Sequence, residues 1–271
     1  MKHRFIGTAA ALLAALMCTA AFSACTGVNK TIDKNETTAE ATAAAVTTAA
    51  EETTSVPPSE ATTHAADEYI RIVRQEKWTM PWGEQSLECT CVQPELTFSS
   101  EDAGEANSEL AEHCRFVFEA LDRGEEMSNV SKGVEYKAYL NGKTLSLVQI
   151  TRAPVNQSVY YYVYNFDTES GTRLSDAELI EERALTTVEE ARSRLSEREA
   201  EYFDQKASQV NGMQDMLDKA KERTLSDEYL DKARYYLADR NTLSAAFYYV
   251  WIAGAEAYCD TTEVFPHLPE Y

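Results

Sequence analysis

The segment that decides the fold covers residues 159–180 and reads VYYYVYNFDTESGTRLSDAELI. Its first eight residues, Val159–Phe166, are almost wholly aromatic or β-branched, which predicts a strand. Because side chains alternate between the two faces of a strand, Tyr160, Tyr162 and Tyr164 fall on one face, and the other face is mostly apolar too. A strand that is apolar on both faces is typical of a central strand covered on both sides.

Two interpretations of these tyrosines fit the sequence. In the first, they belong to the buried core of a sheet. In the second, Tyr160, Tyr162 and Tyr164 form an exposed face that holds a ligand, a role that suits tyrosine because it combines apolar area with a polar tip. The three tyrosines are therefore the candidate binding face. After the strand, a polar turn with Gly171 leads to the segment 175–178, SDAE, which is typical of a capped helix start.

The sequence begins with the features of a bacterial lipoprotein signal peptide. A basic start at residues 2–4 precedes the apolar, alanine-rich stretch Phe5–Phe22. The following Ser23-Ala24-Cys25 resembles a lipobox, in which the cysteine is acylated and begins the mature chain, although Phe22 replaces the usual leucine. We expect residues 1–24 to be removed and Cys25 to carry lipid. An ordinary secretory signal is the alternative, and either one places the mature protein outside the cytoplasm.

The chain is strongly acidic, with 25 basic and 45 acidic residues and a net charge of −20. Removal of residues 1–24 takes away Lys2 and Arg4 and no acidic residue, so the net charge becomes −22. Nucleic acid and anionic lipid repel such a polyanion, and we expect no nucleic-acid partner. A lipid at Cys25 would hold the protein at the extracytoplasmic face of the cell membrane. The acidic body would attract a cationic protein.

Residues 25–66 are dominated by threonine, alanine and glutamate and have no hydrophobic period. Such a composition has almost nothing to bury and predicts a disordered tether. At about 5–6 Å times the square root of its ~40 residues, the tether would span roughly 30–40 Å. That length would lift a folded domain clear of the lipid headgroups.

Four of the six cysteines belong to the expected folded body: Cys89, Cys91, Cys114 and Cys259. Outside the cytoplasm they permit two disulfides with three connectivities. Cys89 and Cys91 point to one face of a predicted strand and do not pair easily with each other, so each would need Cys114 or Cys259. Four small buried thiols are the alternative, and the sequence leaves both open.

Residues 67–184 predict an α+β module. An alternating pattern predicts a strand over residues 84–92 that ends at Pro94, and an apolar stripe predicts a helix over 101–121. Asn141-Gly142 predicts a two-residue hairpin loop that places Leu140 opposite Lys143. With the strand of 159–166, this hairpin would form an antiparallel meander sheet against which the helix packs.

Residues 185–271 predict a helical region. A charged helix runs to about Gln205, and its glutamates, Glu199 among them, indicate a solvated face with many ion pairs. Residues 229–237 and 243–258 predict an αα-hairpin about a turn at 239–241. The second of these segments is apolar nearly all round but too short to span a bilayer, so we expect it to be the central helix of a buried core. The fold class is α+β with a helical C-terminal region.

Residues 84–180 carry an ordered set of short motifs. These are Pro94 before the predicted helix, Ala106-Asn107 inside it, Leu145-Ser146-Leu147 on the hairpin, and Tyr164-Asn165-Phe166-Asp167 followed by Gly171, Leu174, Asp176 and Leu179. In order and spacing this part of the chain resembles a family of extracytoplasmic β/α modules. Members occur in a membrane-anchored anti-sigma factor that binds lysozyme and beside the catalytic domain of a peptidoglycan deacetylase.

The resemblance implies a binding module, with a lysozyme-like cationic protein or peptidoglycan as its partner. Two departures limit how far it reaches. Residues 152–158 replace a Gly-Gly-Ala-His-like loop that members often carry, and the β-rich C-terminal end of the family has no counterpart in the helical pattern of 185–258. No lysozyme-contacting residue is carried over to this chain.

The sequence predicts no catalytic residue, metal site or cofactor. Three histidines remain after removal of the signal peptide, one of them in the tether, and no nucleophile, zinc or phosphate-loop motif is present. An enzymatic alternative is a cell-wall hydrolase that uses carboxylates such as Glu178, Glu181 and Glu182, although consecutive acids near a helix are more often solvated. A third alternative is a scaffold lipoprotein that acts through its C-terminal helical hairpin.

Overall fold

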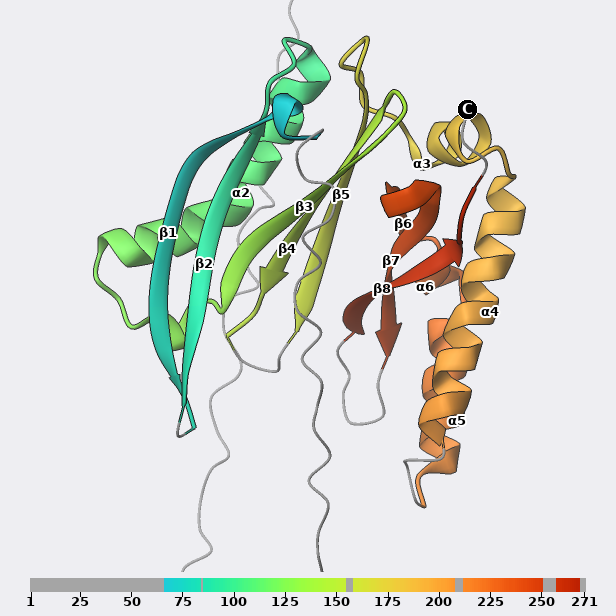
Figure 1. The fold of residues 1–271 in the computed structure, drawn as a ribbon. Helices are drawn as coiled ribbons and strands as arrows, with labels where there is room; N and C mark the ends of the chain where they lie inside the picture. The colour runs from blue at the N-terminus through green and yellow to red at the C-terminus, as the bar shows by residue number, and fades with distance from the viewer. Residues whose placement is uncertain (1–65, 84, 155–157, 208–211, 251–256, 269–271) are drawn as a thin grey trace, which may run out of the picture. The chain divides into compact units, whose positions relative to one another are not determined.

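The computed structural model describes residues 66–83, 85–154, 158–207, 212–250 and 257–268. The expected signal peptide, the expected lipidation site Cys25 and nearly all of the expected tether lie outside these residues. The described part of the chain contains two β-sheets and the helices that pack on them (Figure 1).

The first sheet has five strands in the order β1-β2-β3-β4-β5. Their bounds are β1 Ile70–Trp82, β2 Gln85–Leu96, β3 Gly133–Asn141, β4 Thr144–Arg152 and β5 Val159–Asp167. The strands pair antiparallel, except that β2 and β3 meet in parallel at Cys91 and Val134. The expected meander of β3, β4 and β5 is present, but it belongs to a mixed sheet.

Strand β5 lies at one edge of this sheet, where it pairs with β4. The prediction that it is a central strand is therefore wrong. Both of its faces are nevertheless covered, because α2 packs on one and the second sheet packs on the other. Apolar residues on both faces indicate that both faces are covered. They do not indicate whether the strand is central or at an edge of the sheet.

The second sheet is antiparallel and has the order β6-β7-β8, with bounds β6 Arg234–Ala238, β7 Thr242–Val250 and β8 Ala257–Phe265. The predicted αα-hairpin is therefore wrong, and residues 251–256 of its second helix lie outside the described residues. Strand β7 is apolar on both faces because each is covered, and such a run has no alternation that separates a strand from a buried helix. The turn at 239–241 is present but joins two strands.

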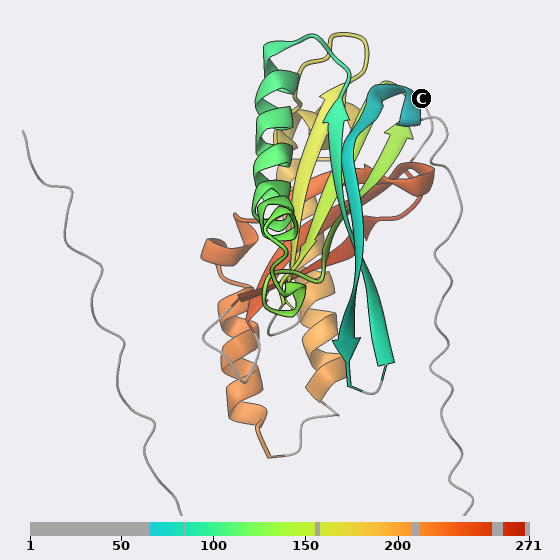
Figure 2. The ribbon, with the colours of Figure 1, turned by 90° about the vertical axis from the view of Figure 1, so that its left-hand side faces the viewer.

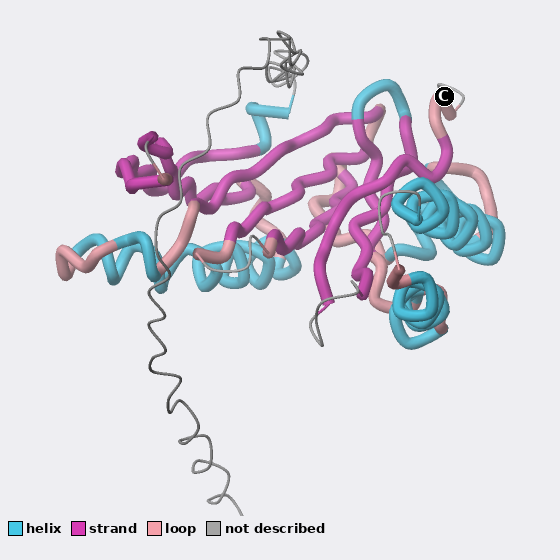
Figure 3. The backbone as a smooth tube through the Cα atoms, turned by 90° about the horizontal axis from the view of Figure 1, so that it is seen from below, coloured by secondary structure: helices cyan, strands magenta, loops and turns pink. Residues whose placement is uncertain are grey.

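The helices are α2 Glu101–Asp122, α3 Asp176–Glu178, α4 Val188–Ala207, α5 Gln214–Thr224 and α6 Asp227–Leu230, with a π-helical turn over Leu179–Arg183 after α3. Helix α2 runs along one face of the first sheet (Figure 2). Helix α4 packs on the outer face of the second sheet, whose inner face contacts the first sheet (Figure 3). The order of layers is therefore helix, sheet, sheet, helix.

Strand β2 continues to Leu96 and is not ended by Pro94. Proline lacks a backbone N–H, but Pro94 lies on β2 opposite Ile72, next to an irregularity in the β1–β2 register, where the ladder is already interrupted. The Asn107 side chain then fixes the end of β2 to α2, because it accepts from the Leu96 N–H at 2.7 Å and donates to the Leu96 carbonyl at 3.0 Å.

The β3–β4 hairpin turns one residue later than predicted. Leu140 pairs with Leu145 and Asn141 with Thr144, so the loop is Gly142-Lys143 and the register differs by two residues from the expected one. Gly142 has φ +56°, whereas Asn141 is not in the left-handed region, which fits a loop with glycine at its first position. The side chain of Asn141 is used elsewhere, because its amide donates to the carbonyls of Leu237 and Ala238.

Polar side chains of the first sheet hold the second sheet in register. Asn165 donates to the Tyr235 carbonyl at 2.7 Å and accepts from Ser146 Oγ at 2.7 Å. Ser146 Oγ in turn accepts from the Leu237 N–H at 3.1 Å. Both side chains are buried and belong to the motifs quoted above. These motif residues therefore have a structural role in this chain, since they attach β6 to the first sheet.

Helix α4 occupies the predicted charged segment, but the prediction that Glu199 is solvated is wrong. Its side chain is only 2% exposed, and it lies one turn from Leu195 on the buried stripe of the helix. Burial raises the pKa of Glu199 from 4.5 to about 8, because a charged carboxylate loses its hydration there. Glu199 follows Leu195 by four residues, and residues at this spacing lie on the same face of a helix. This spacing is the feature of the sequence that indicates an inward side chain.

Candidate functional site

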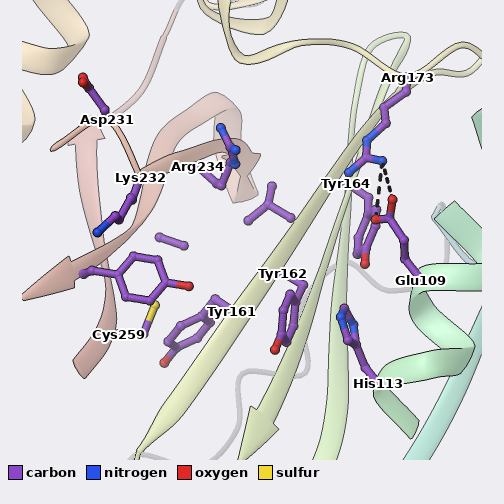
Figure 4. Close-up of a pocket in the computed structure, with 13 residues that line it drawn as sticks. Glu109, His113, Tyr161, Tyr162, Tyr164, Arg173, Asp231, Lys232, Arg234 and Cys259 are labelled. Atoms are coloured by element: carbon purple, nitrogen blue, oxygen red, sulfur yellow. Dashed lines mark hydrogen bonds and ion pairs between the residues drawn. The ribbon is translucent and has the colours of Figure 1, made fainter. Parts of the chain in front are cut away.

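A cleft of about 450 Å³ runs beside β5, between the two sheets (Figure 4). Its lining residues are Glu109, His113, Tyr161, Tyr162, Val163, Tyr164, Arg173, Asp231, Lys232, Arg234, Ala246, Tyr248 and Cys259. Consecutive residues of β5 reach the same cleft, although they point to opposite faces of the strand. The cleft therefore follows the open edge of β5 and is not confined to one face of it.

Of the three tyrosines proposed as a binding face, Tyr162 and Tyr164 line the cleft and Tyr160 does not. Tyr160 is 36% exposed, whereas Tyr164 is 1% exposed. The remaining wall comes from Tyr161 on the other face of β5 and from Tyr248 on β7. A tyrosine hydroxyl is protonated at neutral pH and can donate, and burial raises the pKa of the Tyr162 and Tyr248 phenols further.

His113 is held by two contacts that fix its orientation. Its ring stacks on Tyr162 with centroids 3.6 Å apart, and its Nδ1 lies 2.7 Å from Oε1 of the buried Gln149. The Gln149 amide donates to the Leu110 carbonyl at 3.2 Å, so its NH₂ group must face Leu110 and its oxygen must face His113. Nδ1 therefore carries the proton, and in the neutral ring Nε2 is left as an acceptor.

Charged side chains line one end of the cleft. Nη1 of Arg173 lies 3.2 Å from Oε1 of Glu109, and its guanidinium carbon lies 5.0 Å from the centre of the Tyr164 ring. The guanidinium therefore lies over that ring. Lys232 lies 3.2 Å from Glu228, and Arg234 lies 3.0 Å from Asp176. The cleft of this acidic chain is thus lined by three cations and by two acids, Glu109 and Asp231, of which Glu109 pairs with Arg173 and Asp231 with Arg192 outside the cleft.

The four body cysteines are buried free thiols in the structure. Cys114 Sγ lies 3.5 Å from the carbonyl oxygen of Val92, the residue that follows Cys91. A hydrogen bond with the Cys114 thiol, followed by burial, raises the pKa of Cys91. Cys91 and Cys114 are thus neighbours, whereas Cys259 lies on β8 at the cleft, where burial raises its pKa to about 11.

The carboxylates of the hydrolase alternative do not lie in the cleft. Glu178 closes the capping box at the start of α3, where it accepts from the backbone N–H and the hydroxyl of Ser175 at 2.8 Å and 2.7 Å. The backbone hydrogen bond, followed by the hydroxyl one, holds the pKa of Glu178 below its usual range. Glu181 and Glu182 are exposed. Glu178 is thus engaged in the helix cap, and the other two carboxylates face solvent.

The described residues contain no group of three or more histidine, cysteine or acidic side chains placed to hold a metal ion. None of the helices in that same part of the chain is long and apolar enough to cross a bilayer. Comparison with known proteins gave no matching family model and no matching curated protein.

Sequence reasoning alone identified two tyrosines of the cleft and missed most of its other residues. Tyr248 lies in the segment 243–258 that the apolar pattern assigned to a helix, and Cys259 directly follows that segment. His113 lies beside the predicted helix stripe. Tyr161 was indicated only by the apolar character of the second face of β5. The rest of the cleft depends on contacts between the two sheets.

Proposed function

We propose that this protein is a lipid-anchored lipoprotein of the cell envelope, without enzymatic activity, whose cleft beside β5 binds a cell-wall component or a secreted protein. The observation that carries the proposal is the convergence of four tyrosines on one cleft: Tyr161, Tyr162, Tyr164 and Tyr248. Aromatic walls with a few polar groups are the usual construction of ligand sites in proteins. The lipobox-like Cys25 and the tether would display this site beyond the membrane surface.

The concave shape of the site favours a ligand that enters the cleft over a flat protein surface. About 450 Å³ accommodates a few sugar or amino-acid units. His113 is positioned to accept a hydrogen bond there, and the protonated phenols can donate. The motif resemblance, which implies a partner such as a lysozyme-like protein or peptidoglycan, agrees with this chemistry.

The binding proposal is tested by retention of ligands on the full chain, isolated in detergent and immobilised. Insoluble peptidoglycan and concentrated secreted proteins are applied at low and high salt, and we expect retention by the wild type. The double variant Y162A/Y248A should lose it, because both rings line the cleft. Tyr160→Ala is the matched control, because Tyr160 lies on the same strand outside the cleft. Equal retention by the double variant and the control would contradict the proposal.

The anchoring proposal is tested separately. Mass analysis of the membrane-extracted chain is expected to find an N-terminal Cys25 carrying acyl groups. An intact, unmodified N-terminus at Met1 in a cytosolic fraction would exclude both the anchor and the extracytoplasmic location.

A further inference from the structure

The hydrogen bonds around β5 show which of its backbone groups face outward. Ser158 and Thr168, at even positions, bond toward the neighbouring β4 segment, through Ala153 N to Ser158 O and Thr168 N to Lys143 O. The hydrogen bonds on the side of β5 away from β4 involve odd positions. The Leu174 N–H donates to the Asn165 carbonyl, and the Asp167 N–H donates to the Thr172 carbonyl. Because this direction alternates along an antiparallel strand, the N–H and C=O groups of Tyr161 and Val163 also point away from β4.

Two neighbouring segments occupy parts of this outward edge. The segment after β5 bonds to Asn165 and Asp167 and forms a bridge between Arg173 and Phe166. At the other end, the Tyr161 backbone lies beside the Cys259 thiol, and both residues line the cleft. Val163 lies between these two contacts and lines the cleft. Within the part of the chain that the structure describes, no group hydrogen-bonds its outward N–H or C=O.

An unpaired residue of this kind matches one class of partner. An extended amino-acid residue presents its own N–H and C=O on the same side, and these pair with both groups of an edge-strand residue. The side chains of such a peptide would alternate between the wall of Tyr162 and Tyr164 and the opposite wall with Tyr161 and Tyr248. A peptide residue fixes one donor and one acceptor at the spacing of a β-ladder, which a flexible set of sugar hydroxyls does not.

The charged side chains of the cleft indicate a second property of the ligand. Lys232 and Arg234 each make one ion pair, with Glu228 and Asp176, and both of these partners lie outside the cleft lining. An ammonium has three N–H donors and a guanidinium has five, so donors remain for a further anion. Each of the two side chains can therefore pair with a carboxylate on the ligand.

We propose that the cleft binds an extended peptide that carries a carboxylate, with one residue paired to the backbone of Val163 and the carboxylate beside Lys232 and Arg234. This inference rests on the proposed binding function and names the ligand class. The peptide can come from the stem of peptidoglycan or from an acidic segment of a secreted protein, since both supply the same chemistry.

The test measures binding of three soluble probes to the full chain in detergent by calorimetry. The probes are peptidoglycan stem peptides, synthetic acidic pentapeptides of L-residues, and peptide-free glycan strands. We expect at least one peptide probe to bind and the glycan strands not to bind, and the two peptide arms identify the source. Binding of glycan strands alone would overturn the peptide inference and leave the proposed function standing. Binding of none, together with failed retention of wall and proteins, would overturn both.

Two further measurements place the peptide at Val163. In hydrogen exchange on the wild type, saturation with the bound peptide should slow exchange at the Val163 amide and leave the amides of β7 unchanged. Val163→Pro removes the outward N–H at an edge position where proline is tolerated, and it should weaken peptide binding about tenfold. Val159→Pro makes the same change at another outward-facing position of β5 that does not line the cleft, and it should bind as the wild type does. An unprotected Val163 amide in the complex would overturn the proposed pairing, whatever the variants show.

Discussion

Strands β5 and β7 are both apolar on two faces, but they occupy different places in their sheets. Strand β7 lies between β6 and β8, so both of its backbone edges are paired. Strand β5 pairs with β4 on one edge, and part of its other edge lies open in the cleft around Val163. Position in the sheet, more than composition, therefore makes one strand a core element and the other the wall of a cleft.

The two strands also differ in what covers them. Strand β5 is covered by α2 and by the second sheet, and β7 by the first sheet and by α4. The sheet-to-sheet layer is fastened by buried amide and hydroxyl groups from the first sheet. Because this layer joins the two sheets, we expect β5 and β7 to unfold together as one cooperative unit. A destabilising substitution on either strand should then lower the stability of both sheets.

The largest expected effect compares the cores on the two strands. Phe166 on β5 is fully buried against α2, and Phe247 on β7 is 5% exposed in the core beneath α4. Replacement of either by alanine removes a large ring and leaves a cavity, which should lower the free energy of unfolding by about 3–5 kcal/mol. Denaturant unfolding of both variants measures the effect.

The exposed Tyr160 on the same strand supplies the control, because Tyr160→Ala should change stability by less than about 1 kcal/mol. A loss below about 1 kcal/mol for Phe247→Ala would mean that β7 is not packed as described. Two separate unfolding transitions in either core variant would show that the sheets are independent.

The fold of the first sheet could be predicted because local signals agree there. The β-branched and aromatic run of β5, the stripe of α2 and the glycine at position 142 each favour the element that forms. The exact loop could not be predicted, since Asn141 hydrogen-bonds Leu237 and Ala238, which are about a hundred residues away in sequence. A tertiary contact thus moved the turn by one residue.

The second sheet could not be predicted from pattern, because β7 has no polar face. Ser244 is its small polar residue on the inner side, and it is buried as well. For the same reason only part of the cleft was visible in the sequence. Tyr162 and Tyr164 come from a strand that was identified, whereas Tyr248 comes from a strand assigned to a helix and Cys259 from a strand that was not predicted.

A pH experiment probes the helix layer over the second sheet. Glu199 on α4 is 2% exposed, its Oε2 has no hydrogen-bond partner among the described residues, and its pKa is raised from 4.5 to about 8. The folded state then holds this proton more tightly than the unfolded state does. Stability should therefore fall as pH rises from about 4.5 to about 8 and stay lower above that range.

Glu199→Gln removes the titrating group and should raise the free energy of unfolding at pH 8 by about 4 kcal/mol, with little change at pH 4. Urea unfolding at a series of pH values gives the comparison, and Glu197→Gln on the exposed side of the same helix is the matched control. If both variants follow the wild-type pH profile, Glu199 is solvated, and α4 does not cover the second sheet as described.

The next effect concerns the buried hydrogen bonds that join β5 to β6. Asn165→Ala leaves the Tyr235 carbonyl without its donor and Ser146 without its acceptor in a buried layer. The expected loss of stability is about 2 kcal/mol, since each unsatisfied buried group costs about 1–3 kcal/mol. Thermal unfolding measures it, with the exposed Asn129→Ala as the control. Equal stability of the two variants would mean that the sheets are held by apolar contacts alone.

The smallest expected effect concerns the turn through which β3 and β4 approach β6. Gly142 has φ +56°, a conformation that alanine adopts only with strain, although a Cβ there would meet no atom within 4 Å. Gly142→Ala should therefore cost about 1 kcal/mol from backbone strain alone. Lys143→Ala, in the same loop, loses an exposed ion pair with Glu169 and should change stability by less than about 0.5 kcal/mol. If the two variants unfold alike, residue 142 is not left-handed. That outcome would exclude the Gly142-Lys143 loop described here and equally the Asn141-Gly142 loop that the dipeptide favours, since both need a left-handed residue 142.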